Sequence, residues 1–212
     1  MSLLNDLKSA GLCVLGTVEA QSGDEWATGA QQLILIGPDE PAFWLIFRAA
    51  PEYSDGQTDP MNRWSTRVIT QIANQHDAVA LFPFGGPPWP PFISWALRAA
   101  TIFSSPVSLL VHSERGLFVS FRAALALKHK LPPMIGTSPC TTCSAPCLTV
   151  CPVNALTADG YDVAACTAHI ATVQGRECMQ GCLVRRSCPV GGHLRLEEQS
   201  AFHMDAFLRS NI

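Results

Sequence analysis

Eight of the nine cysteines lie in one stretch of the chain, between Cys140 and Cys188, and only Cys13 precedes it. They fall into two groups of four, and each group ends in a Cys-Pro pair, Cys151-Pro152 and Cys188-Pro189. Cysteine thiolates bind soft metals such as iron and zinc, and thiols also form disulfides. The clustering therefore indicates that the last third of the chain is stabilised by a different chemistry from the rest.

The first group reads Cys140-Thr-Thr-Cys143-Ser-Ala-Pro-Cys147-Leu-Thr-Val-Cys151-Pro152. Bacterial ferredoxins hold their clusters with C-x2-C-x2-C-x3-C-P, in which the cysteine before the proline ligates the other cluster. The spacing here is x2, x3 and x3, and the same Cys-Pro pair follows. We expect three of these thiolates to bind one cube and Cys151 to bind a second.

The second group has spacings of x11, x3 and x5. Because both groups of four end in Cys-Pro, a pair of clusters that exchange their fourth ligands is the simplest arrangement. One predicted [4Fe-4S] cluster has the ligands Cys140, Cys143, Cys147 and Cys188. The other has the ligands Cys166, Cys178, Cys182 and Cys151. Arg185 and Arg186 lie between two of the ligands, and we expect them or backbone N–H groups to face the cluster sulfurs.

Two other uses of these cysteines remain open at this point. Zinc also takes four cysteines, although usually in C-x2–4-C pairs that are far apart in the chain. The inserted residues after Cys143 and Cys182 leave disulfides or free thiols as the second alternative. Cys13 has apolar neighbours and is predicted to be a buried strand cysteine.

The first 131 residues mix predicted strands and helices, as an α+β domain does. Helices are predicted over residues 2–10, 62–75, 92–103 and 122–130. Strands are predicted over 11–18, 32–36, 43–47 and 78–82, with a hairpin of 107–112 and 117–121. The run from Phe82 to Phe92 holds five prolines and is predicted to be a loop. Leu131-Pro132-Pro133 marks the expected boundary, so the predicted domains are 1–131 and 134–212.

The composition excludes several classes of protein. Apolar residues make up 48% of the 212 residues and charged residues only 15%, which argues against a disordered chain. A net charge of −3 argues against general nucleic-acid binding. No uncharged apolar run is long enough to span a membrane, and Met1–Lys8 lacks the pattern of a secretory signal, so we expect a cytoplasmic protein.

The segment from about 138 to 210 resembles the C-terminal two-cluster part of epoxyqueuosine reductase, a cobalamin-dependent oxidoreductase. The matching features are the cysteine-rich ferredoxin loop, the lone helical Cys166 and the final Cys188-Pro189. That family's N-terminal catalytic segment has no counterpart here, and both cysteine spacings differ. The resemblance therefore implies the clusters and does not extend to a tRNA substrate.

The segment from about 81 to 126 resembles the cobalamin-processing CblC family. The resemblance rests on Phe82-Pro83-Phe84 and on His112, Gly116-Leu117-Phe118 and Arg122. Ser113 stands where that family usually has proline. The resemblance implies a nitroreductase-like fold of a sheet packed by helices, which binds cobalamin or a flavin such as FMN.

Four residues of the first 131 are candidates for binding that cofactor. Arg122 is placed to grip a phosphate or carboxylate, and His112 to act as a ligand or proton donor. Phe84 and Trp89 belong to the proline-rich loop, which is a candidate lid. Each of the four also has an ordinary structural interpretation, and no catalytic residue is assigned.

These features predict an iron–sulfur reductase. Its two clusters would pass single electrons to a flavin or corrinoid, or to its small-molecule substrate, in the N-terminal domain. The alternatives are a ferredoxin-like carrier that docks on a redox partner protein without chemistry of its own, and a degenerate protein with zinc or disulfides in place of clusters.

Overall fold

The computed structural model describes residues 2–211 and shows an α+β protein, as the sequence predicts. The chain divides into two compact units. Unit 1 contains residues 2–102 and 120–136, and unit 2 contains 103–119 and 137–211. The sequence-based boundary placed 103–119 in the first domain, whereas these residues pack with the cysteine-rich part of the chain.

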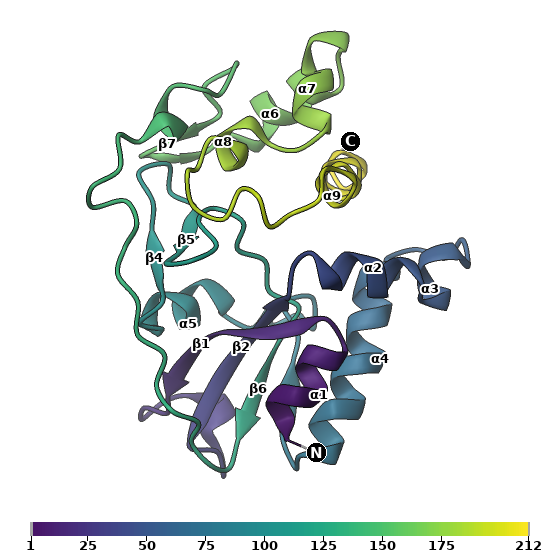
Figure 1. The fold of residues 1–212 in the computed structure, drawn as a ribbon, viewed down its shortest axis with the longest axis vertical. Coiled ribbons are helices and arrows are strands. Elements are labelled where there is room, and N and C mark those ends of the chain that lie inside the picture. The colour runs from purple at the N-terminus through teal and green to yellow at the C-terminus, as the bar shows by residue number, and fades with distance from the viewer. Residues whose placement is uncertain (1, 212) are drawn as a thin grey trace. The chain divides into compact units, whose positions relative to one another are not determined.

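Unit 1 is built on a four-stranded antiparallel sheet in the order β1-β2-β6-β3, of which β1, β2 and β6 are labelled in Figure 1. The strands are β1 (Leu12–Glu19), β2 (Gln32–Pro38), β6 (Ala123–Leu127) and β3 (Val79–Leu81). Every residue of β2 and β6 is buried, which fits their nearly continuous apolar sequences. The one polar side chain of β2, Gln32, donates to the carbonyl of Leu131 and so meets its hydrogen-bonding needs.

Helices cover this sheet. They are α1 (Leu3–Ser9), α2 (Ala42–Arg48), α3 (Pro51–Ser54), α4 (Pro60–Gln75) and α5 (Phe92–Arg98), with the 3-10 turn η1 (Glu25–Ala27). The long helix α4 presents an apolar stripe that includes Trp64, Ile69 and Ile72, all buried. α1 and α4 pack against the sheet and against each other, and α5 packs against β1.

The predicted strand over 43–47 is wrong, because these residues form the helix α2. Phe43, Trp44 and Phe47 are fully buried and lie on one helical face. Trp64 meets the ring of Phe43 edge-on, with 5.4 Å between the ring centroids, and the ring of Phe47 at 5.9 Å. A short apolar run does not distinguish a buried strand from a buried helix, and this aromatic cluster decides for the helix.

The predicted helix over 122–130 is also wrong, because Ala123–Leu127 form the strand β6. Alanine and leucine favour helices, but β6 lies between β2 and β3 and hydrogen-bonds to both. Burial between two strands outweighs a local preference of a few tenths of a kcal/mol per residue.

The region between these elements also differs from the prediction. The helix predicted over 92–103 ends at Arg98, and β4 (Ile102–Ser104) follows it. β4 pairs with β5 (Leu110–His112). The predicted hairpin joined 107–112 to 117–121, but residues 117–121 form no strand. A single bridge joins His112 to Gly116 instead.

Unit 2 consists mainly of short elements joined by turns. They are η2 (Pro146–Leu148), β7 (Leu156–Thr157), β8 (Gly160–Tyr161), α6 (Val163–Ile170), η3 (Val173–Gly175), α7 (Arg176–Met179), α8 (Leu183–Arg186) and α9 (Glu197–Arg209). The core around Val107, Val111, Leu117 and Val184 includes the buried Cys147, and four more cysteines pack against it. A core this small stabilises a fold only weakly, so cross-linking chemistry is expected to contribute.

Within residues 2–211, none of the helices combines the length and the apolar character needed to cross a membrane.

The aromatic cluster of unit 1 provides a stability test. Trp64→Ala removes a side chain that is 2% exposed, and we expect it to lower the free energy of unfolding by about 3–5 kcal/mol. Trp89→Ala is the matched control, because Trp89 is 63% exposed and its loss should change that energy by less than about 0.5 kcal/mol. Urea unfolding followed by circular dichroism measures both variants, and equal losses would contradict this account of the core.

Candidate metal centre

Four of the cysteines line one small cavity in unit 2, with a volume of about 20 Å³. We call them set A: Cys140, Cys143, Cys147 and Cys188. The first two lie in the loop before η2, Cys147 lies in η2, and Cys188 follows α8. The rest of the wall is almost entirely apolar and includes Val111, Leu117 and several prolines.

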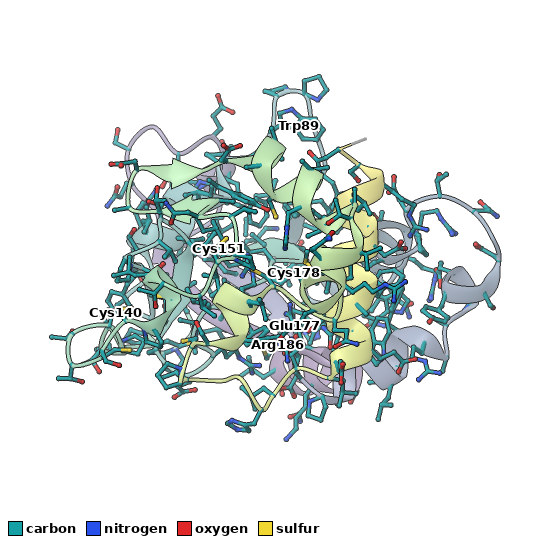
Figure 2. The ribbon with its side chains drawn as sticks, turned by 90° about the horizontal axis from the view of Figure 1, so that it is seen from above. Trp89, Cys140, Cys151, Glu177, Cys178 and Arg186 are labelled. Atoms are coloured by element: carbon teal, nitrogen blue, oxygen red, sulfur yellow. The ribbon has the colours of Figure 1, made fainter. Side chains whose placement is uncertain are left out.

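The other four line a second small cavity of about 20 Å³, also within unit 2. We call them set B: Cys151, Cys166, Cys178 and Cys182. Cys166 lies in α6, Cys178 in α7, and Cys182 at the N-terminal cap of α8. Figure 2 shows Cys140 of set A apart from Cys151 and Cys178 of set B.

Electrostatic interactions follow the same division. Burial raises the pKa of the Cys147 thiol, and the thiols of Cys140, Cys143 and Cys188 raise it further. Burial likewise raises the pKa of Cys178, with further contributions from Cys182, Cys166 and Cys151. These two thiols therefore lie within electrostatic range of the other members of their own sets, and a set of four thiolates would repel itself strongly without positive charge nearby.

The chain crosses between the sets at each Cys-Pro pair. Cys151 follows three members of set A in the sequence and belongs to set B, whereas Cys188 follows three members of set B and belongs to set A. These are the two groups that the cysteine spacing predicts. That they bind metal stays a prediction.

A close backbone contact holds Cys188 in place. Gly116 has a φ of +55°, and a Cβ atom built there would lie 2.7 Å from the Cys188 sulfur and 2.1 Å from the Val190 carbonyl oxygen. Gly191 (φ +72°) similarly lies against the backbone of Arg115. Only glycine allows the turn after β5 to approach the 188–191 loop this closely.

Backbone N–H groups and the side chain of Tyr161 face the sulfurs. The N–H of Ala145 donates to the Cys143 sulfur at 3.4 Å, and that of Ala155 to the Cys151 sulfur at 3.2 Å. The phenol of Tyr161 lies beside the Cys166 sulfur and lowers the pKa of that thiol, against the larger effect of burial. Tyr161 also stacks on Phe207 of α9, with 6.0 Å between the ring centroids.

Of the two predicted arginine donors, Arg185 is the one near a cysteine. It is partly buried, it donates to the carbonyl of Leu117, and its charge interacts with the Cys182 thiol. Burial lowers the pKa of Arg185, and Cys182 acts in the opposite direction. Arg186 is exposed. Set B therefore has a cation and a phenol beside it.

None of the nine cysteines forms a disulfide in the structure. Among residues 2–211, no group of three or more His, Cys, Asp and Glu side chains is arranged to hold a metal ion. Cys13, predicted to be a buried strand cysteine, lies in β1, is partly buried and donates to the carbonyl of Pro38 at 3.3 Å.

The structure brings together two of the four candidate cofactor residues of the N-terminal region. The guanidinium of Arg122 lies over the ring of Phe84, 5.7 Å from its centroid, and both residues belong to unit 1. Trp89, labelled in Figure 2, is 63% exposed. His112 belongs to unit 2, is 3% exposed and accepts a hydrogen bond from the N–H of Glu114 at Nδ1.

Sequence reasoning missed Tyr161, Asn62 and Ser65. Tyr161 is separated from Cys166 by only five positions, but nothing in its neighbours indicates that it faces a thiol. Asn62 and Ser65 contact Arg122 from positions about 60 residues earlier in the chain, which no local pattern can show.

Comparison with family models, with curated proteins and with solved structures finds no match to this chain.

The contact at Gly116 gives a test of the geometry of set A. In Gly116→Ala the new methyl group would displace Cys188, so we expect alkylation of Cys188 by iodoacetamide to become several-fold faster, measured by mass spectrometry. Gly29→Ala is the control, because Gly29 has a similar φ of +74° with open space around it. Unchanged alkylation of Cys188 in Gly116→Ala would show that this contact does not hold the cysteine.

Proposed function

We propose that this protein is an iron–sulfur oxidoreductase whose unit 2 holds two [4Fe-4S] clusters, one in set A and one in set B. The observation that carries the proposal is the gathering of eight thiols into two sets of four around cavities of nearly equal size. When bound, such clusters supply one-electron transfer.

The donor atoms fit this group better than they fit zinc. A structural zinc ion takes four thiolates at about 2.3 Å from one point, which brings the sulfurs close to one another. In a four-iron cube each thiolate binds a different iron atom, so the four sulfurs lie around a wider space. Each set lines the wall of a cavity, and among residues 2–211 no three of these side chains are arranged around a single metal ion, so the wider arrangement is the better match.

The residues around each cavity would set the properties of the cluster. Apolar walls limit the access of water, and N–H groups that face sulfur stabilise negative charge there. The Tyr161 phenol and the Arg185 charge add to this stabilisation at set B. A cluster in set B is therefore expected to have the higher reduction potential of the two.

We further propose that the protein is a reductase. It would pass single electrons to a flavin or corrinoid bound by unit 1, or to the substrate of that cofactor. The resemblances to epoxyqueuosine reductase and to the nitroreductase-like CblC family suggest this acceptor. The contact between Arg122 and Phe84 supports a binding role for that part of unit 1.

Anaerobic purification with iron and sulfide analysis tests the proposal. We expect about eight iron and eight sulfide per chain, with broad visible absorbance near about 400 nm. Cys151→Ser and Cys188→Ser should each damage a different cluster, distinguished by electron paramagnetic resonance of the reduced protein. Cys13→Ser is the control and should keep the full iron content, since Cys13 lies in unit 1.

Zinc in place of iron in the anaerobic protein would overturn the proposal, as would intact S–S bonds among the eight cysteines. Damage to the same cluster by Cys151→Ser and Cys188→Ser would leave the iron–sulfur function standing and refute the exchange of ligands.

Tyr161→Phe tests the difference between the two clusters. Loss of the phenol removes a hydrogen-bond donor from the Cys166 sulfur, so the reduction potential of the set B cluster should fall while that of set A stays unchanged. Redox titration followed by electron paramagnetic resonance measures both. Tyr53→Phe is the matched control, because Tyr53 is the only other tyrosine and lies in unit 1. Equal shifts of both clusters, or none, would refute this role of Tyr161.

A further inference from the structure

Arg122 carries a buried positive charge with neutral partners only. Its side chain lies in unit 1 just before β6 and is 7% exposed. Nε donates to the hydroxyl of Ser65 at 2.9 Å, and Nη2 donates to the amide oxygen of Asn62 at 2.7 Å. The guanidinium also lies over the ring of Phe84. Among residues 2–211 no carboxylate forms an ion pair with it.

The electrostatics of Arg122 agree with this geometry. Burial alone lowers the pKa of Arg122 to about 10, and no neighbouring acid opposes that shift. The side chain nevertheless stays charged at neutral pH, because this value is well above 7. An uncompensated buried charge is unfavourable for folding, whereas an anion from solution would remove that cost.

An open groove adjoins this charge within unit 1. It contains about 790 Å³ of empty space that is open to solvent, and it is lined by Asp59, Asn62, Arg63, Thr66, Arg67 and Phe84. Asn62 and Phe84 are the residues that contact Arg122. Nη1 of Arg122 has no hydrogen-bond partner among the described residues. It is absent from the fully buried nitrogen atoms that lack a partner, so it keeps some exposure to solvent.

The other charges of the groove are already compensated. Arg63 forms a two-point ion pair with Asp55, with both N···O distances at 2.7 Å. Arg67 pairs with Glu52. The charge of Asp59 acts on Arg63. Arg122 is therefore the cation of this region that an incoming ligand would neutralise.

We infer that the groove beside Arg122, Asn62 and Phe84 binds the phosphate or carboxylate group of a small molecule, with the free edge of the Arg122 guanidinium as its donor. The planar fork of arginine matches both oxyanions, and the Ser65 and Asn62 oxygens fix the orientation of that fork. This site belongs to unit 1 and does not depend on the cysteines. It deepens the proposed reductase by naming the chemical group through which unit 1 would hold its ligand.

Thermal unfolding of the full-length protein tests the inference, with inorganic phosphate and acetate as probes and sodium chloride at equal ionic strength as the reference. A ligand that binds only the folded protein raises its melting temperature as its concentration rises. We expect at least one of the two oxyanions to raise the melting temperature of the wild type, and Arg122→Gln to abolish that rise. The anion that acts identifies the group that is bound.

Lys128→Gln is the matched control and should keep the rise, because it removes one positive charge of unit 1 from an exposed ion pair with Asp77 outside the groove. Asn62→Ala provides a second variant in case Arg122→Gln does not fold, and it should weaken the effect of the anion. The inference is overturned if neither anion stabilises the wild type beyond chloride, or if Arg122→Gln responds as the wild type does. Iron content reports the proposed clusters separately, so failure of either idea is visible on its own.

Discussion

The arrangement of unit 2 depends on one electrostatic constraint, the crowding of four thiols into each of two apolar cavities. Burial raises the pKa of Cys140, Cys147, Cys166 and Cys178, and the neighbouring thiols of the same set raise it further. Four thiolates in such a place need positive charge among them. The proposed iron–sulfur clusters would supply that positive charge as iron, and this would account for the residue type.

This constraint also explains how so little regular structure can hold unit 2 together. Most of its helices are of one or two turns, and its small core includes the side chain of Cys147 and contacts four more cysteines. Because Cys151 lies with set B and Cys188 with set A, bound clusters would tie each half of the cysteine segment to the other. Metal binding and folding are coupled in sites of this kind, so the ligands would take the place of a larger hydrophobic core.

Unit 1 is stabilised in a different way. Its sheet has two fully buried central strands, and the aromatic cluster around Trp64 packs α2 against α4. Arg122 is a cation buried in this interior, and two neutral oxygen atoms and an aromatic ring hold it. A polar group retained in such a place is a candidate for function, and here it adjoins a groove that is open to solvent.

The sequence by itself determined the grouping of the cysteines, because ligand spacing and the two Cys-Pro pairs are local features of the chain. It also determined the α+β class and the long helix α4, whose apolar stripe has a clear helical period. Tertiary structure alone decided that 43–47 is a helix and 123–127 a strand, because short apolar runs suit either form and their neighbours select one. It also decided that Arg122 meets Phe84, Asn62 and Ser65 while His112 lies in the other unit, since such contacts join residues that no local pattern relates.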